Sequence, residues 1–181
     1  MKSIIIENIV AYAVIADSLN VEDIVEKIPD FQFNPDEFFG ATFKLDDPKT
    51  AVLILPSGKA VCTGAKNMED VETSIKKITS MIKNIGIKVK TKPKIETQNI
   101  IASTDVEKEL HLSSISKGLL LEHVNYEPDH FPGLIYNIDE IRALLLIFSS
   151  GKIVCTGAKN IEDTTKAIEM MKEKLSSIGA L

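Results

Sequence analysis

One six-residue stretch, CTGAKN, occurs twice in this 181-residue chain, at Cys62–Asn67 and at Cys155–Asn160, 93 positions apart. Further matches at the same offset are Pro56–Lys59 with Ser149–Lys152, Phe38 with Phe131, and Gly40 with Gly133. An identity of this length, flanked by collinear matches, indicates an internal duplication. The chain should therefore fold as two similar repeats, residues 1–90 and 91–181, and its function should be read on a body with twofold pseudo-symmetry.

The composition is that of an ordinary globular protein, with 44% hydrophobic and 26% charged residues. No apolar run approaches the roughly 18 residues that a membrane-spanning helix needs, and the N-terminus lacks the pattern of a signal peptide. We therefore expect an intracellular protein without a membrane partner. The net charge of −5 argues, taken alone, against a nucleic-acid partner, because phosphate binding needs concentrated Lys and Arg.

No arrangement of residues predicts catalysis or metal binding. Cys62 and Cys155 hold the same place in their repeats, and neither has the neighbouring Cys or His of a zinc site, so each should be a small buried residue on a strand. The three histidines lack metal-site spacing. We predict no enzyme activity, no metal and no cofactor.

The hydrophobic pattern gives each repeat the order strand, helix, four strands, long helix. In the first half the expected strands are 4–14, Phe31–Phe33, Phe39–Leu45, Ala51–Leu55 and Lys59–Thr63. A short helix should run from Val21 to Ile28, with its counterpart in Glu109–Leu121, and a long helix should follow the N-cap Asn67.

The helices of a repeat can cover only one face of its sheet, and the other face is also largely apolar. Its alternate residues are Val10, Leu53, Leu55, Val61, Ile101, Leu146, Phe148 and Val154. An apolar sheet face without a covering layer predicts an interaction surface.

Several motifs resemble those of one family. They are ENIVA and QNIIAS on the first strands, the turns NPDEFFG and YEPDHFPGLIY, the stretch LLIFSSGKIVCTGAK, and the repeated CTGAK. The chain resembles the TATA-box-binding protein family, in its archaeal form of a core domain alone, from about Ile4 to Ile178. The resemblance implies an α+β saddle, with a curved ten-stranded antiparallel sheet whose concave face meets DNA and four helices on the convex side.

This family is itself the standard example of minor-groove binding with apolar wedges and DNA kinking. The resemblance implies a transcription initiation factor that binds TATA-box DNA, bends it, and recruits transcription factor B and, indirectly, RNA polymerase. It would act in the cytoplasm at the archaeal nucleoid, or in the nucleus if eukaryotic. Hydrogen bonds to base edges would come from Asn8, Asn99, Thr63 and Thr156, and packing on the groove floor from Val10, Ile101, Val61 and Val154.

The resemblance places pairs of wedges at the two ends of the DNA-binding face. Phe131 and Phe148 match both positions in the second repeat, whereas in the first repeat Phe38 is partnered by Leu55. Leucine can wedge a base step but stacks less well than a ring. We therefore expect a weaker or sequence-shifted kink at the first-repeat end.

Charged residues complete the expected interface. Candidate phosphate contacts are Lys44, Lys49, Lys59, Lys66, Arg142, Lys152 and Lys159, while Asp46, Asp47, Asp139 and Glu140 stand where a strongly basic binder would carry Lys or Arg. Binding should therefore depend largely on apolar contact or on a partner protein. In the family the second-repeat stirrup docks transcription factor B, so Glu127 and Asp129 are candidates for that contact; a solvated turn is the alternative.

Other functions remain open at this point. The chain could be a paralogue with relaxed sequence preference, which Leu55 favours. It could be a pseudo-dimeric binding protein that holds a lipid-like ligand or another protein on its apolar face. An enzyme using the Thr-Gly-Ala-Lys corners on a small phosphate is a third alternative, although no titratable groups converge in the sequence pattern.

Overall fold

The computed structural model describes residues 2–119 and 123–181. The chain divides into two compact units. The first unit is Asn8–Gln98, and the second unit combines the N-terminal segment up to Glu7 with Asn99–Leu181. The repeat boundaries predicted from the sequence, residues 1–90 and 91–181, stay a prediction. In the structure the N-terminal segment up to Glu7 packs with the later half of the chain.

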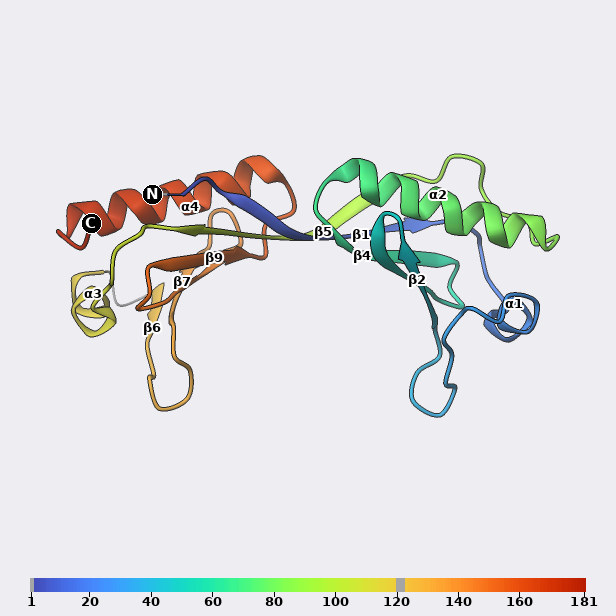
Figure 1. Cartoon of the computed structure of the whole chain (residues 1–181), viewed down its shortest axis with the longest axis horizontal. Coiled ribbons are helices and arrows are strands. Elements are labelled where there is room, and N and C mark those ends of the chain that lie inside the picture. Colours follow the sequence, from blue (N-terminus) through green and yellow to red (C-terminus); the bar gives the residue numbers. More distant parts are fainter. Residues whose placement is uncertain (1, 120–122) are drawn as a thin grey trace. The chain divides into compact units, whose positions relative to one another are not determined.

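The strands form one sheet in the order β2-β3-β4-β1-β5-β9-β8-β7-β6. The strands are β1 (Ile5–Val14), β2 (Ala41–Asp46), β3 (Lys49–Ile54), β4 (Lys59–Ala65), β5 (Ile95–Asp105), β6 (Val124–Asn125), β7 (Leu134–Ile138), β8 (Ala143–Ile147) and β9 (Lys152–Thr156). The helices are α1 (Val21–Lys27), α2 (Met68–Asn84), α3 (Leu112–Gly118) and α4 (Ile161–Ser177). The predicted duplicated α+β fold is confirmed. Figure 1 shows the same order of elements in the two halves of the chain, except that the second half has the additional short strand β6.

The prediction of ten strands was wrong by one, because the described residues form nine. The expected strand at Phe31–Phe33 is reduced to an isolated bridge between Gln32 and Thr42. The Phe31 N–H donates back to the Ile28 carbonyl, and the turn at Asn34 begins two residues after Gln32. This leaves too short an extended run for a ladder. The equivalent segment of the second unit is β6, which pairs two residues with β7.

The long helices begin where their caps predict. Asn67 Oδ1 accepts a hydrogen bond from the Asp70 N–H at 2.8 Å, and Asn160 Oδ1 accepts one from the Asp163 N–H at 2.7 Å. The acidic residues in the first turn of each helix interact favourably with the positive end of the helix dipole. The short helix α3 ends at Gly118, and the last two residues of the predicted helix, Leu120 and Leu121, lie outside the described residues.

Each unit buries one face of its strands beneath a long helix. Helix α2 packs on β3 and β4, and α4 packs on β8 and β9 (Figure 1). The buried side chains alternate along the strands, as Ala11 and Ala13 do on β1 and Ala60 and Cys62 on β4. The residues between them point to the opposite face of the strands. That second face carries the candidate site.

Candidate nucleic-acid interface

Strand register arranges the uncovered face of the first unit in rows. One row is formed by Tyr12, Val61, Leu53 and Thr42, each directly opposite the next in the ladder. The next row joins Thr63, Ala51 and Lys44. The apolar members of both rows are half-buried, and Thr63 and Lys44 are exposed. The register therefore brings the predicted residues Val61, Thr63 and Lys44 onto one face.

The second unit repeats this arrangement. Its rows are Ser103, Val154, Leu146 and Ile135, and then Thr156, Leu144 and Asn137. Lys59 begins β4 and Lys152 begins β9, each two residues before the central valine of its row. Because side chains two apart on a strand share a face, both lysines border the uncovered face of their own unit.

Asn8 is held where β1 and β4 meet. Its Oδ1 accepts a hydrogen bond from the Gly64 N–H at 2.7 Å, and its Nδ2 donates to Thr63 Oγ1 at 3.1 Å. The backbone donor fixes which end of the amide is oxygen, so the NH₂ group is oriented towards Thr63. Asn99 repeats this geometry in the second unit, accepting from the Gly157 N–H at 2.7 Å and donating to Thr156 Oγ1 at 3.0 Å.

Each such amide has two N–H groups, and the threonine takes one of them. The other N–H gives each unit a preoriented donor beside the half-buried Val10 or Ile101. The threonine hydroxyl lies 3.5 Å (Thr63) or 3.3 Å (Thr156) from the asparagine Oδ1, so it can donate either to that oxygen or to a ligand. The structure thus brings Asn8 together with Thr63, and Asn99 together with Thr156; that these residues read base edges stays a prediction. The geometry suits acceptors on an approaching ligand.

The predicted wedge residues of the second unit lie against one another. The rings of Phe131 and Phe148 are 6.0 Å apart between centroids and 61° apart in plane. Gly133 lies beside them, because a Cβ there would lie 2.8 Å from Phe131 Cε1 and 3.1 Å from Phe148 Cε1. In the first unit a Cβ on Gly40 would meet Phe38 Cε1 and Leu55 Cδ2, both at 2.8 Å. Phe38 and Leu55 therefore face one another around Gly40 as the two phenylalanines do around Gly133.

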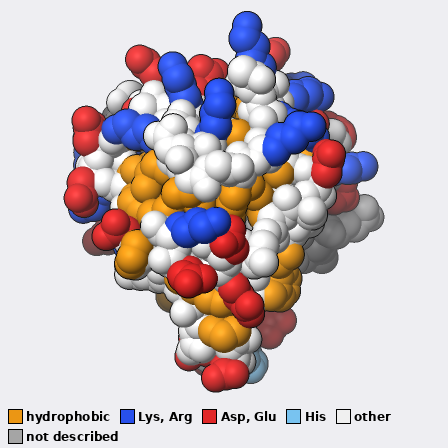
Figure 2. All heavy atoms as spheres, turned by 90° about the vertical axis from the view of Figure 1, so that its right-hand side faces the viewer, with side chains coloured by type: hydrophobic (Ala, Val, Ile, Leu, Met, Phe, Trp, Pro, Cys, Tyr) orange, Lys and Arg blue, Asp and Glu red, His pale blue; other side chains and the backbone are white. Residues whose placement is uncertain are grey.

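The candidate phosphate-binding side chains have different settings. Lys59 Nζ lies 4.7 Å from the centroid of the Tyr12 ring, a cation–π distance. Arg142 is exposed in the turn between β7 and β8, with a left-handed φ of 55°. Figure 2 shows the basic side chains of this face in the upper and middle parts of the view, mixed with acidic ones, whereas the charged side chains at the narrow lower end are all acidic. The strongest basic surface in this view is therefore not on the loop side.

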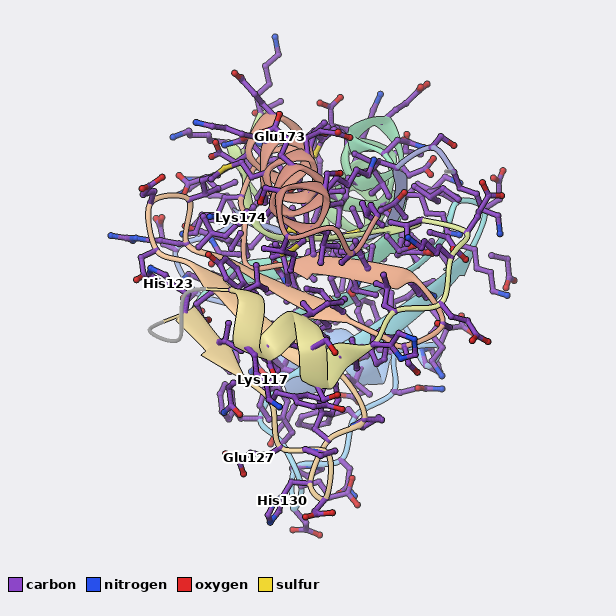
Figure 3. The ribbon with its side chains drawn as sticks, turned by 90° about the vertical axis from the view of Figure 1, so that its left-hand side faces the viewer. Lys117, His123, Glu127, His130, Glu173 and Lys174 are labelled. Atoms are coloured by element: carbon purple, nitrogen blue, oxygen red, sulfur yellow. The ribbon has the colours of Figure 1, made fainter. Side chains whose placement is uncertain are left out.

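Glu127 and Asp129 lie in the exposed loop that joins β6 to β7. Glu127 Oε2 lies 3.4 Å from Nδ1 of His130, and both side chains are well exposed. The Glu127 carbonyl accepts from the N–H groups of His130 and Phe131, each at 2.9 Å, which closes the turn before Phe131. Figure 3 shows Glu127 and His130 on this loop, far from Glu173 and Lys174 on α4.

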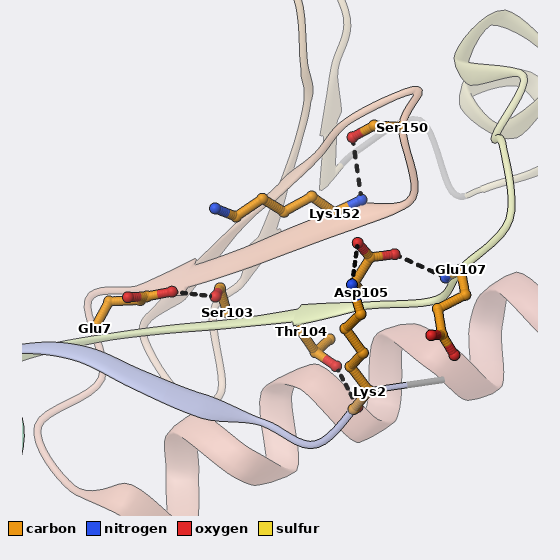
Figure 4. A network of polar contacts seen from close by, with 8 residues as sticks. All are labelled: Lys2, Glu7, Ser103, Thr104, Asp105, Glu107, Ser150 and Lys152. Atoms are coloured by element: carbon orange, nitrogen blue, oxygen red, sulfur yellow. Dashed lines mark hydrogen bonds and ion pairs between the residues drawn. The ribbon is translucent and has the colours of Figure 1, made fainter.

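Two hydroxyl–carboxylate pairs on the uncovered face were missed by the sequence analysis. Tyr12 OH donates to Glu96 Oε2 at 2.8 Å. Figure 4 shows the other pair, in which Ser103 Oγ donates to Glu7 Oε1 at 2.5 Å. The hydrogen bond to Glu96 raises the pKa of Tyr12, with burial and the negative charge of Glu96 adding to it. The signal for Tyr12 was present, since the alternation that begins at Asn8 and Val10 reaches it next.

Both cysteines are fully buried free thiols, as expected of small core residues on strands. Burial raises the pKa of Cys62, and it raises that of Cys155 to about 11. Within residues 2–119 and 123–181, His, Cys, Asp and Glu do not cluster in threes in a way that could hold a metal ion. Within the same residues, no helix is long and apolar enough to span a membrane.

Comparisons with known proteins agree with the duplicated architecture. The family model described as transcription factor TFIID, or TATA-binding protein, matches residues 3–85 and 94–178. The chain is 46% identical to the TATA-box-binding protein of Thermoplasma volcanium over 180 residues, 99% of this chain and 98% of that protein. It is 43% identical to that of Archaeoglobus fulgidus over 176 residues, 97% of this chain and 96% of that protein.

A solved structure gives the same result for the fold. The structure titled Methanococcus jannaschii TBP superposes with a TM-score of 0.87 at 38% sequence identity, covering 97% of this chain and 99% of that one. The match extends over both repeats, and the two family-model segments correspond to them. The chain therefore belongs to the TATA-box-binding protein family.

Proposed function

We propose that this protein is a transcription initiation factor that binds TATA-like promoter DNA in the minor groove through its uncovered sheet face. In this proposal the apolar side chains at the ends of that face wedge into base steps and bend the DNA. The bound protein then recruits transcription factor B and, through it, RNA polymerase. The TATA-box-binding names of the relatives support the DNA target, and the residues of the face support the mode of binding.

The observation that carries the proposal is the doubled Asn–Thr–Gly group. In each unit a glycine N–H donates to the asparagine Oδ1 and the asparagine Nδ2 donates to a threonine hydroxyl, in nearly the same geometry. An A·T pair presents only acceptors in the minor groove, whereas a G·C pair adds the guanine amino donor. Two fixed groups of donors therefore suit a short A·T-rich segment and would leave a guanine amino group without an acceptor.

The apolar rows explain how a protein of net charge −5 could bind DNA. Val61, Leu53 and their counterparts Val154 and Leu146 supply surface that loses water when it packs against sugars and the groove floor. Phe131 and Phe148 offer a ring pair that can enter an opened base step, which costs unstacking but lets the bent DNA contact more protein. This combination does not require a strongly basic surface.

The exposed loop of residues 127–131 supports the second part of the proposal. Glu127 and Asp129 give the loop negative charge, and the turn that precedes Phe131 is closed by backbone hydrogen bonds. A basic surface on transcription factor B would complement these carboxylates. Replacing Glu127 and Asp129 together by Gln and Asn should weaken the ternary complex while leaving DNA binding by the protein alone nearly unchanged.

A gel shift on a TATA duplex, with and without transcription factor B, tests the proposal. Asn8→Asp keeps the oxygen that accepts from Gly64 but replaces the amide donors with a charge, so the fold should persist while groove acceptors are repelled. We expect at least about tenfold weaker binding, from one or two lost or reversed hydrogen bonds. Asn84→Asp, at the exposed end of α2, adds the same charge and should bind like the wild type. Absence of binding by the wild type in both conditions would overturn the proposal.

A further inference from the structure

The first unit carries an exposed aromatic pair that its counterpart lacks. Phe38 is followed by Phe39, and their rings are 4.4 Å apart between centroids and 30° apart in plane. In the second unit the position after Phe131 is held by Pro132. Each unit thus has a pair of rings beside the equivalent glycine, Gly40 or Gly133, but the second ring of the pair comes from a different position in each unit.

The first unit lacks a ring at position 55, where the second unit has Phe148. Around Gly133 the second unit sets Phe131 against Phe148, whereas around Gly40 the first unit sets Phe38 against Leu55. Leu55 offers no π-face for stacking on a base. Among the described residues, Phe39 supplies the one aromatic ring that contacts the ring of Phe38.

Phe39 is also placed unfavourably for a residue with a purely structural role. Its side chain is 61% exposed and Phe38 is 43% exposed, and both are among the few large hydrophobic side chains exposed within the described residues. Figure 2 shows hydrophobic surface among acidic side chains towards the loop end of this unit. Such exposure costs solvation free energy unless a ligand covers the rings.

We propose that Phe39 supplies the ring that Leu55 lacks, so that Phe38 and Phe39 together form the first-unit wedge and stack on a base step of DNA. The inference rests on the proposed function, because the ligand is the same minor groove. The rings are continuous with the candidate interface, since Phe38 faces Leu55 at the end of the strand that carries Leu53. The first-repeat kink is then formed by two neighbouring rings of one loop.

The competing role for Phe39 is local packing. The ring also borders a hollow of about 310 Å³ lined by Leu19, Phe33, Pro35 and Pro56 among others. If Phe39 only covered this hollow, its loss would lower the stability of the first unit and leave the DNA complex unchanged once the protein is folded. The experiment must therefore separate stability from binding.

A double-mutant cycle separates them, using wild type, Phe39→Ala, Leu55→Phe and the double variant on one TATA duplex. Loss of one base–aromatic stack should weaken binding by Phe39→Ala about tenfold. Leu55→Phe should recover most of the affinity lost in Phe39→Ala but improve binding by the wild type by a clearly smaller factor, because it restores a second ring opposite Phe38 only where that ring has been removed. Pro132→Ala, at the matched position of the second unit, should bind like the wild type.

A local probe shows where each ring acts. Duplexes carrying 2-aminopurine at one or the other end of the TATA element report unstacking as increased fluorescence. Phe39→Ala should reduce the signal at the end opposite to that affected by Phe148→Ala. Thermal melts of all variants establish that each is folded at the assay temperature.

The outcomes distinguish this inference from the proposed function. If the wild type binds and bends the duplex while Phe39→Ala does so equally well, the inference is overturned and the proposed function stands. The same holds if Leu55→Phe improves affinity by the same factor with and without Phe39, because the two rings would then act independently. If the wild type does not bind TATA DNA at all, both are overturned.

Discussion

The glycine turns that hold Asn8 and Asn99 should tolerate alanine least where a backbone oxygen lies closest. Gly157 has φ of 96°, and a Cβ there would lie 2.6 Å from the Arg142 carbonyl oxygen. Gly179, in the same unit, has φ of 72° and nothing within 4 Å of such a Cβ. The pair therefore separates the cost of the left-handed backbone from the cost of a steric clash.

The magnitudes follow from these two terms. A left-handed conformation costs an L-residue roughly 1–2 kcal/mol, which is the whole expected loss for Gly179→Ala. Gly157→Ala adds an overlap with backbone that cannot rotate away, about 1–3 kcal/mol by analogy with overpacking. We thus expect a loss of about 2–5 kcal/mol in the free energy of unfolding for Gly157→Ala. Gly64, where the nearest backbone atoms are at 3.3 Å, should fall between the two.

Urea denaturation with the slope held constant measures these free energies. DNA binding supplies a second measurement, because the Gly157 N–H holds Asn99 and its displacement should weaken binding even where the variant is fully folded. Gly179→Ala should bind DNA like the wild type. Equal destabilisation by Gly157→Ala and Gly179→Ala would show that the close Arg142 carbonyl oxygen adds no steric cost.

Three further predictions follow from the wedges, the charge and the buried thiols. Phe148→Ala should reduce DNA bending, measured by energy transfer between the duplex ends, more than Leu55→Ala does, and equal losses would contradict the asymmetry. Affinity should fall with salt less steeply than the release of about eight counterions requires, measured by titration between low and moderate salt. The pKa of Cys155, raised from 9.0 to about 11, makes the folded state bind the thiol proton more tightly, so stability should fall as pH rises from 9 to 11. Cys155→Ala should flatten that dependence in denaturation curves at several pH values, and an unchanged slope would show that the thiol does not cause it.

The duplication, the α+β class and most elements were predictable because they depend on local pattern. The 93-residue offset is visible in the letters, and Asn67 and Asn160 cap the long helices by a contact only three residues away. The buried face also follows from alternation, which Ala11, Cys62 and Val52 confirm. Each of these inferences uses interactions within a few residues or a periodicity of two.

The features of the fold that depend on pairing between distant segments could not be predicted from the sequence. The hydrophobic pattern does not indicate that the segment up to Glu7 packs with the later half of the chain, because that packing depends on contacts between residues far apart in the sequence. The strand expected at Phe31–Phe33 had the right composition, but the turns on either side left room for one bridge only. Strand propensity indicates that a segment favours an extended backbone, but it does not give the number of residues that the flanking turns leave free to pair.

The candidate site was predicted unevenly for a similar reason. The groups around Asn8 and Asn99 were expected from the family motifs, and the structure gives them matching hydrogen bonds, although their role in reading DNA stays a prediction. Tyr12 and Phe39 were not among the candidate site residues, because these were selected mainly at positions where the two repeats match, and Tyr12 and Phe39 stand at positions that differ between the repeats. Comparing Phe39 with Pro132 at the same offset would have found it.

If the uncovered face reads DNA from the minor groove, base analogues that change one groove at a time should reveal it. Replacing the A·T pairs of a TATA duplex with inosine·cytosine pairs gives the major groove the pattern of G·C while the minor groove keeps that of A·T, because inosine lacks the amino group of guanine. We predict affinity for this duplex within about threefold of that for TATA and much weaker binding to the G·C duplex. Binding to the inosine duplex as weak as to the G·C duplex would contradict the account.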